Sequence, residues 1–274
     1  MTTLTDSVST SPMDDAEFRF GGIRRLLGTH HQQRLAKAHV AVVGVGGVGS
    51  WTVEALARSG VGKLTLIDLD DVCVSNINRQ LHALDGEIGK PKVAVLAERL
   101  QRINPALKVN AVEAFVTPSN PGQQLSQDID HVVDAIDSLA AKTALVAFCV
   151  EQGLGLTVTG GAGGLVDPTR IERRDLARTE QDPLLAKLRR NLRKHHGFPR
   201  DQKRPFKVTC ICSSEQRRFP DPAGEVCASK PRPGESTRLD CASGYGAATF
   251  VTGSFGFAAA AHAIEAIGHK DSQS

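Results

Sequence analysis

The residues with the clearest chemical potential lie between positions 40 and 80, in the stretch VAVVGVGGVGSWTVEALARSGVGKLTLIDLDDVCVSNINRQ. A short apolar run is followed at once by four glycines and then by a segment with helical spacing; the glycines are Gly44, Gly46, Gly47 and Gly49. In a strand, glycine turn and helix of this kind, the glycines let backbone approach a phosphate and the helix N-terminus favours anions. The stretch therefore predicts a nucleotide-binding loop.

Polar residues that follow the second apolar run bear on the choice of nucleotide. Asp68 ends that run, 24 residues after Gly44, where a carboxylate can accept hydrogen bonds from ribose hydroxyls of either NAD or ATP. Further polar side chains come next, namely Asp70, Asn76, Arg79, Gln80 and Lys92. Cations beside the phosphates suit a step that expels pyrophosphate, whereas hydride transfer needs none. Arg79 alone would be read as a surface ion pair, but the whole set favours ATP.

The motif DAID places Asp134 and Asp137 after the fourth apolar run. The carboxyl ends of strands are where ligands bind in open parallel sheets. Mg²⁺ is usually held there by one or two carboxylates together with phosphate oxygens. We therefore expect a carboxylate of this motif to hold Mg²⁺, with a capping role for Asp137 at the next helix as the alternative.

The elements that must position these residues can be read from the hydrophobic pattern. Apolar runs that predict buried strands lie at 40–43, 64–67, 108–112, 131–136 and 156–159. Helical spacing follows at 50–59, 90–104 and 138–152, the last with Ser138 as its N-cap. This alternation predicts an α/β fold: a Rossmann-like, mostly parallel sheet with helices on both faces.

After residue 170 the composition changes. Residues 170–207 carry thirteen Lys or Arg against five Asp or Glu, and one helix is predicted at 182–194. Residues 208–240 resemble loops, with four prolines. An excess of eight positive charges can neutralise several phosphates of an RNA, and a solvated basic helix face is an equally good reading. The residues that we assign to RNA binding are Arg189, Arg190, Arg193 and Lys194.

Residues 244–263 contain no Asp, Glu, Lys or Arg, over a length of about 20 residues that would suffice to span a membrane. Gly, Ala, Ser and Thr dominate this segment, so its free energy of insertion would be small. We expect instead an apolar helix that returns to the core or to a dimer seam. The predicted organisation is a disordered leader at 1–16, an ATP-binding region at 17–165, a basic substrate-binding insertion with loops at 166–240 and the C-terminal apolar helix at 241–274.

Composition excludes several classes of protein. Aromatic residues make up only 4%, which argues against binding single-stranded nucleic acid by base stacking. Residues 1–16 lack the apolar core of a secretory signal, so six free thiols in a reducing cytoplasm are expected. Cys73 and Cys149 fall on predicted core elements.

The remaining cysteines predict no zinc site. TCICSS holds a C-x-C pair, and Cys227 and Cys241 are 14 residues apart, whereas structural zinc needs four tetrahedral ligands. Cys241, in LDCASGYG, is the first candidate for a nucleophile and Cys227 the second, although free cysteines are more often inert packing. TGGAGG at 159–164 can bind an anion or a monovalent cation through its backbone, or form a plain turn.

Residues 40–140 resemble the adenylating domain of the ubiquitin-activating-enzyme-like superfamily (ThiF, MoeB and HesA). The resemblance rests on GVGGVG, LIDLDDVCVSNINRQ, GKPK and DAID. It implies that the protein adenylates a carboxylate with ATP and Mg²⁺ and forms a homodimer. It also implies that Asp68 binds the ribose, that Asn76, Arg79 and Lys92 bind the phosphates, and that Asp137 binds the metal.

Members of this superfamily often use an arginine near the N-terminus to reach the ATP of the partner subunit. Arg19 and Arg25 are both placed to play that part. The sequence does not choose between them.

A narrower branch, the tRNA threonylcarbamoyladenosine dehydratases, is resembled across residues 19–258. The matching stretches are RFGGIRRLLG, NRQLHAL, INPALKV, TGGAGGLVDPTRI, DLARTEQDPLLAKLR and DCASGYGAATFVTGSFGF. The resemblance implies that ATP activates the carboxylate of threonylcarbamoyladenosine in tRNA, and that intramolecular capture then closes a ring with AMP leaving. Proximity accelerates such a step greatly, so no enzyme nucleophile is strictly required. It further implies a partner from a sulfur-acceptor or cysteine-desulfurase system.

Three other functions remain open from the sequence. An activator of a ubiquitin-like sulfur carrier would fit the superfamily, but the missing zinc cysteines and the basic segment argue against it. An NAD-dependent oxidoreductase would use the glycines and Asp68, but it would not need Arg79, Lys92 and Asp137. A scaffold that binds nucleotide without turnover is less attractive because the whole phosphate-binding set is present.

Overall fold

A computed structural model describes residues 12–201, 203–220, 225–227 and 245–269 of the 274. Its centre is a seven-stranded sheet of order β3-β2-β1-β4-β5-β7-β6. The strands are β1 (His39–Val43), β2 (Lys63–Ile67), β3 (Lys108–Val112), β4 (His131–Asp134), β5 (Gly155–Thr159), β6 (Ile171–Asp175) and β7 (Thr209–Ser213). All pairings are parallel except that of β6 with β7. The predicted α/β fold with a mostly parallel sheet is confirmed.

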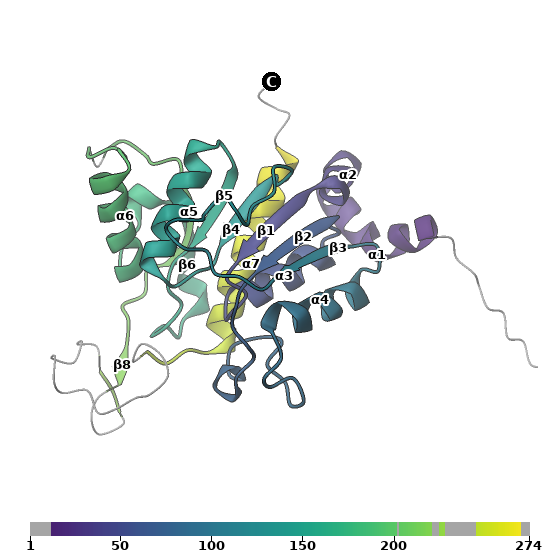
Figure 1. Cartoon of the computed structure of the whole chain (residues 1–274), viewed down its shortest axis with the longest axis horizontal. Helices are drawn as coiled ribbons and strands as arrows, with labels where there is room; N and C mark the ends of the chain where they lie inside the picture. The colour runs from purple at the N-terminus through teal and green to yellow at the C-terminus, as the bar shows by residue number, and fades with distance from the viewer. Residues whose placement is uncertain (1–11, 202, 221–224, 228–244, 270–274) are drawn as a thin grey trace, which may run out of the picture.

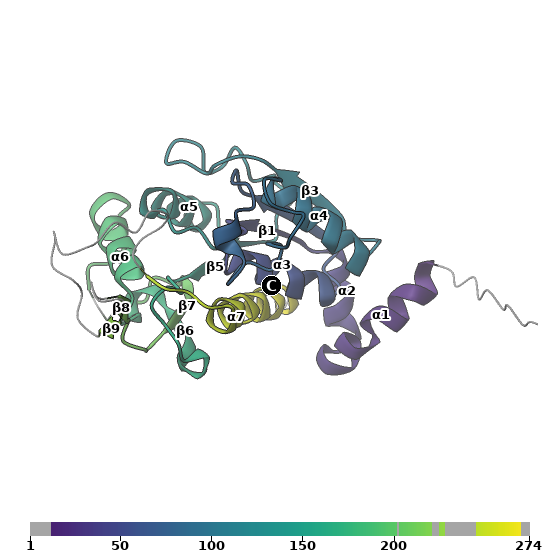
Figure 2. The same cartoon turned by 90° about the horizontal axis from the view of Figure 1, so that it is seen from below.

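Helices cover both faces of the sheet (Figures 1 and 2). Strand order runs outward from β1 in both directions, so right-handed crossovers place α3 (Gly49–Arg58) and α4 (Lys92–Ile103) on one face and α5 (Leu139–Glu151) on the other. The basic helix α6 (Pro183–His195) packs beside α5. The C-terminal helix α7 (Thr249–Gly268) packs against α3, β4 and β5, and α2 (Thr29–Lys37) lies against it.

The N-terminal helix and several short elements complete the described chain. The helix α1 (Pro12–Leu27) packs on α2 and projects from the body (Figure 2). Three single turns of 3₁₀ helix are η1 (Val74–Asn76), η2 (Pro168–Arg170) and η3 (Leu176–Arg178). The strands β8 (Phe219–Pro220) and β9 (Val226–Cys227) form a small antiparallel pair apart from the main sheet.

The sequence analysis predicted a basic substrate-binding insertion with loops at 166–240 and did not reveal β6 and β7, which lie in this range and belong to the main sheet. Four residues of β7, Cys210 through Ser213, are buried, but its TCICS sequence is too short to stand out among the prolines that follow. β6 reads IERRD and lies at the sheet edge, where charged side chains discourage further pairing. Both strands complete the sheet that carries the site.

Two predicted boundaries also change. The helix α1 begins at Pro12, inside the predicted disordered leader at 1–16; proline is well tolerated at a first helical position, and residues 1–11 lie outside the described residues. The apolar helix runs over 249–268 rather than 244–263. Cys149 is buried as expected, whereas Cys73 is exposed because the chain has already left β2 for the loop at the sheet edge.

Packing explains the apolar composition of α7. The helix is long and apolar enough to pass a simple test for a membrane span, yet one side of it lies in the core. A Cβ on Gly256 would lie 2.6 Å from the carbonyl oxygen of Val48, so the small residue permits close contact with the start of α3. The core helix predicted from its small residues is thereby confirmed.

Candidate active site

The functional side chains lie along the carboxyl edge of the sheet, where the strand order reverses between β1 and β4. In spatial order, this edge presents Asp68 after β2, the loop 44–49 after β1, Asp137 after β4 and the glycine loop 160–164 after β5. Neighbouring strands are about 4.8 Å apart, so the row from β2 to β5 spans about 14 Å. The edge can therefore hold an extended nucleotide with a second reactant beside it.

Two glycines of the loop 44–49 are required by the packing of the protein, whether or not a ligand binds. Gly44 has a φ of +83°, and a Cβ there would lie 2.9 Å from the carbonyl oxygen of Ala135. A Cβ on Gly49 would lie 1.9 Å from the carbonyl oxygen of Gly44. These positions allow β1, the loop and α3 to pack closely against the end of β4.

Gly46 differs, because a Cβ there would meet nothing closer than Nε2 of Gln80 at 3.7 Å. Gly47 is intermediate, with Cγ2 of Thr252 at 3.3 Å. The folded chain therefore leaves room for a side chain at Gly46. The open space at this position suits direct approach of the loop backbone to a phosphate.

Asp68 ties the loop to the next strand. Its Oδ2 accepts a hydrogen bond of 2.8 Å from the backbone N–H of Val45, and its Oδ1 accepts one of 3.0 Å from the N–H of Asp70. A carboxylate has about four acceptor sites, so these bonds leave capacity for ribose hydroxyls. The residue thus fixes the loop, and the ribose contact expected of it stays a prediction.

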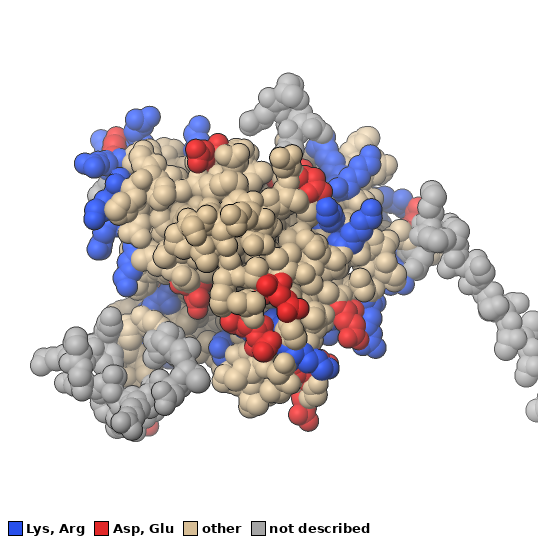
Figure 3. All heavy atoms as spheres, viewed as in Figure 1, with Lys and Arg blue, Asp and Glu red and all other residues tan. Residues whose placement is uncertain are grey.

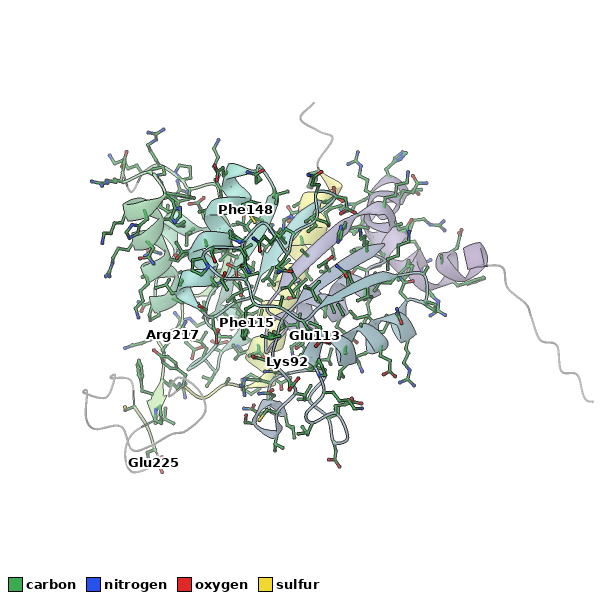
Figure 4. The ribbon with its side chains drawn as sticks, in the orientation of Figure 1. Lys92, Glu113, Phe115, Phe148, Arg217 and Glu225 are labelled. Atoms are coloured by element: carbon green, nitrogen blue, oxygen red, sulfur yellow. The ribbon has the colours of Figure 1, made fainter. Side chains whose placement is uncertain are left out.

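Lys92, labelled in Figure 4, lies at the start of α4 and forms an ion pair with Asp70. The Lys92 side chain is only 6% exposed, and its Nζ lies 2.8 Å from Oδ2 of Asp70. The backbone N–H of Lys92 also donates to the carbonyl oxygen of Asp70. Asp70 was expected at the nucleotide; the structure places it as the partner that holds the lysine ammonium at the sheet edge.

The segment 76–80 crosses this edge. Asn76 is buried, and its Oδ1 accepts a 3.0 Å bond from the N–H of Cys73. Nη1 of Arg79 donates to the carbonyl oxygen of Ser75 at 2.7 Å, which holds its half-buried guanidinium along the segment. Gln80 is buried, and its Oε1 has no hydrogen-bond partner among the described residues. The Nε2 atom of the same amide is the nearest atom to a Cβ built on Gly46, so an unpaired oxygen on this side chain fits a site that a polar ligand completes.

The sequence analysis missed the residues that hold this segment in place. The carbonyl oxygen of Arg79 accepts hydrogen bonds from Nε1 of Trp51 at 3.1 Å and from Oγ1 of Thr252 at 3.2 Å. Oγ1 of Thr249 donates to the carbonyl oxygen of Asn78 at 2.6 Å. Trp51, which is the single tryptophan and follows Gly49 closely, was a visible signal. The threonines of α7 gave none, because they lie about 170 residues further along the chain.

The two aspartates of DAID have different roles. Asp134 is fully buried, its Oδ1 lies 2.8 Å from Nζ of the equally buried Lys142, and the same oxygen accepts from the N–H of Ile136. Burial raises the pKa of Asp134, against the opposing charge of Lys142. This pair fixes the turn after β4 and does not face the open edge of the site.

Asp137 is exposed in that turn. Ser138 occupies the N-cap position of α5, as predicted, but its side chain makes no capping bond. No group of three or more His, Cys, Asp or Glu within the described part of the chain could hold a metal by itself. A single free-standing carboxylate suits Mg²⁺ that takes its other ligands from phosphates and water, so Asp137 fits that ion.

The basic helix carries a shallow groove of about 570 Å³. Its lining consists of one alanine and five cations: Ala186, Arg189, Arg190, Arg193, Lys194 and Arg200. Figure 3 shows Lys and Arg side chains gathered at the upper left of the view, where Figure 1 labels α6. The predicted cluster of positive charge is therefore present on the surface, with Arg200 added to it.

Two of the four predicted RNA-binding residues also make hydrogen bonds within the protein. Nη1 of Arg189 donates to the carbonyl oxygen of Thr179 at 2.8 Å, and Nε of Arg193 donates to that of Pro199 at 3.1 Å. Arg190 and Lys194 are exposed, so they carry the more available charges.

The remaining candidates are two cysteines and two arginines, and the structure describes three of these four residues. Cys241 lies outside the described residues, and Cys227 is partly buried in β9. Nη1 of Arg19 donates to the carbonyl oxygen of Ile103 in its own subunit at 3.2 Å, whereas Arg25 is exposed on α1.

Comparisons with known proteins place this geometry in a family. The model of the ThiF family matches residues 22–274. The chain is 51% identical over 247 residues to the tRNA threonylcarbamoyladenosine dehydratase of Escherichia coli strain K12, covering 90% of this chain and 92% of that protein.

Solved structures agree with the sequence match. The crystal structure of the E. coli tRNA N6-threonylcarbamoyladenosine dehydratase in complex with ATP gives a TM-score of 0.83 at 45% identity, covering 94% of this chain and 97% of that one. The complex of the same enzyme with AMP gives 0.84 at 45% identity, covering 97% and 100%.

We predict that Gly46→Ala separates binding from stability. The added methyl meets no atom closely, so the free energy of unfolding should change by less than about 1 kcal/mol. The same methyl would stand where a phosphate approaches, so affinity for ATP should fall about tenfold or more. Calorimetric titration with ATP and Mg²⁺ beside a denaturant melt measures both. Unchanged ATP affinity would show that this loop does not contact the nucleotide.

Proposed function

The chain belongs to the ThiF family, and on that premise we propose that it is an ATP-dependent tRNA threonylcarbamoyladenosine dehydratase. It adenylates the carboxylate of threonylcarbamoyladenosine in tRNA and promotes cyclisation. The observation that carries the proposal is a match over almost the whole chain, basic helix included, to an enzyme whose structures contain ATP and AMP. ATP and AMP are the substrate and product that adenylation followed by cyclisation requires.

The order of residues along the sheet edge supports an arrangement in which the ribose lies at Asp68 and the triphosphate runs over the loop 44–49 toward Asp137. The N-terminus of α3 and the cations Arg79 and Lys92 face the phosphates. Negative charge grows on the leaving pyrophosphate as the substrate carboxylate attacks the α-phosphorus, so fixed positive charge there stabilises the transition state.

Asp137 would hold Mg²⁺, which supplies further neutralisation of the phosphates when bound. Once the acyl-adenylate has formed, a nucleophilic atom of the same threonylcarbamoyl group attacks the carboxyl carbon and AMP departs. Overall, the nucleoside loses one water and ATP becomes AMP and pyrophosphate. Because the attacking group is already tethered, the protein needs only to position it.

A covalent route through Cys241 remains the alternative for the second step. Such a route would form a thioester before ring closure. Full turnover by a Cys241→Ala variant would leave the intramolecular route as the one that operates.

The test of the proposal uses the whole protein with ATP, Mg²⁺ and tRNA that carries or lacks the threonylcarbamoyl group. We expect AMP release and loss of one water from the modified nucleoside, measured by mass spectrometry, only with the modified tRNA. Omission of Mg²⁺ should stop both. AMP release driven instead by a carrier-protein C-terminus, or reduction of NAD, would overturn the proposal.

We further propose that the exposed charges of α6 bind the tRNA backbone. The double variant Arg190→Glu/Lys194→Glu should weaken tRNA binding at low salt by about tenfold or more, because a cation that no longer pairs with a phosphate no longer displaces its counterion. Affinity for ATP should stay unchanged, since α6 packs beside α5 and not at the nucleotide loop. Lys37→Glu/Arg102→Glu, the same change of charge at exposed positions of α2 and α4, serves as a matched control. Equal tRNA affinity in the α6 variant would remove this surface from the account.

We also propose a cytoplasmic homodimer in which Arg25 reaches the ATP of the partner subunit. The projecting α1 exposes Phe18 and Leu26, which are 81% and 77% accessible, and α7 exposes Phe250 and Phe257. Large apolar side chains in such numbers favour a protein–protein contact. Sedimentation should give a dimer, and Arg25→Ala should lose turnover while remaining dimeric. A monomer with full activity would contradict both statements.

A partner from a sulfur-acceptor or cysteine-desulfurase system also belongs to this proposal. It rests on the family resemblance alone. Pull-down of such a protein by the whole chain would be its first test, and failure to bind purified candidates would count against it.

A further inference from the structure

A buried arginine sits inside the glycine loop that follows β5 (Figure 4). The Arg217 side chain is 7% exposed. Its Nη2 donates to the carbonyl oxygen of Gly161 at 2.7 Å and to Oδ2 of Asp182 at 3.1 Å, and its Nη1 donates to the carbonyl oxygen of Gly163. One cation therefore meets two loop carbonyls and one carboxylate.

The sequence left a monovalent cation open at this loop. Two of the carbonyls that would bind such an ion, those of Gly161 and Gly163, already face the guanidinium. Arg217 thus supplies positive charge from within the chain. Its planar fork of donors matches several fixed oxygens at once, which a lysine ammonium would match less well.

Asp182 connects this cluster to the basic helix. Its Oδ1 accepts from the N–H groups of Leu184 and Leu185, at 2.9 and 3.0 Å, and so caps the first turn of α6. Its Oδ2 accepts from the N–H of Gly161 at 2.9 Å as well as from Arg217. A single buried carboxylate therefore joins the start of α6 to the glycine loop.

Three glycines of the loop have no room for a side chain or adopt a backbone conformation that favours glycine. A Cβ on Gly160 would lie 2.3 Å from Oδ2 of Asp182, and one on Gly163 would lie 2.9 Å from Cβ of Tyr245. Gly164 has a φ of +75°, and its N–H donates to the carbonyl oxygen of Gly246. The same loop thus contacts the segment that leads into α7.

The loop 160–164, which Arg217 and Asp182 hold, lies at the carboxyl edge of the sheet beside the proposed nucleotide site. β5 is the neighbour of β4, so the loop borders Asp137 on the side away from Asp68. The start of α6, the helix on which we propose that tRNA docks, is joined to this same loop through Asp182, so tRNA bound to α6 brings its modified nucleoside to the site from the β5 side. The loop 160–164 is therefore the part of the described chain that faces the incoming substrate.

We propose that Arg217 is a positioning residue that acts as a built-in cation for this loop. It holds the loop 160–164 in the form that borders the reacting carboxylate, and through Asp182 it couples the loop to tRNA docked on α6. This inference rests on the proposed function. Arg217 does not touch ATP or tRNA itself, so its removal should affect turnover far more than binding.

The experiment is chemical rescue of Arg217→Ala in the whole protein. We expect kcat for modified tRNA to fall about tenfold to a hundredfold, because the loop no longer has its fixed geometry. The Kd values for ATP and tRNA should stay within about twofold. Millimolar guanidinium should restore several-fold activity, whereas urea, which has a similar shape without the charge, should not. Arg218→Ala, which removes the exposed neighbouring arginine, is the matched control and should behave as the unchanged protein.

Three results would overturn the inference: turnover of Arg217→Ala within about twofold of the unchanged protein, parallel loss of binding and kcat, or absence of rescue in a folded variant. If Arg217→Ala does not fold, Asp182→Asn takes its place, since asparagine still caps a helix but removes the charge that faces Arg217. That variant should have a lower kcat and keep its tRNA affinity; full kcat would overturn the coupling. If the protein without any substitution does not convert modified tRNA, that result counts against the proposed function and not against the role of Arg217.

Discussion

The site depends on one close approach, that of the loop after β1 to the chain that leaves β4. Gly44 lies so near Ala135 that a side chain there would touch its carbonyl oxygen at 2.9 Å, and Gly49 closes the same turn onto Gly44. This contact brings the nucleotide loop and the turn of Asp137 to one edge. The hydrogen bond from Val45 to Asp68 then fixes the end of β2 against the same loop. Three strand ends become one surface able to hold an extended triphosphate.

Segments far along the chain, α7 and the residues after β7, hold the other loops of this edge in place. The helix α7 lies on the sheet face that α3 shares, and its threonines hold the backbone of Asn78 and Arg79. On the other side, β7 brings Arg217 into the glycine loop after β5. The segment at Asn78 and Arg79 and the glycine loop after β5 are thus stabilised by different parts of the C-terminal region. This arrangement explains why the similarity to the dehydratases extends beyond the first 140 residues.

Much of this could be predicted from local pattern. The strand, glycine turn and helix around Gly44 were evident because their signals are close in sequence, and so was the carboxylate at the end of β2. Longer-range features could not be predicted: β7 is a short cysteine-bearing run, β6 carries the charges of an edge strand, and Asp134 is buried against Lys142 of α5. Likewise, sequence showed a basic helix but not that Arg189 is bonded to Thr179. Side-chain roles that depend on a partner far along the chain require the folded structure.

The central claim is that a substrate carboxylate attacks the α-phosphorus of ATP at this edge. The most direct measurement follows heavy oxygen placed in the carboxylate of threonylcarbamoyl-tRNA during one turnover. The account predicts that one labelled oxygen appears in AMP, because the bond broken on cyclisation lies between the carboxyl carbon and that oxygen. Label in inorganic phosphate, with ADP as product, would show attack at the terminal phosphorus and would contradict the account.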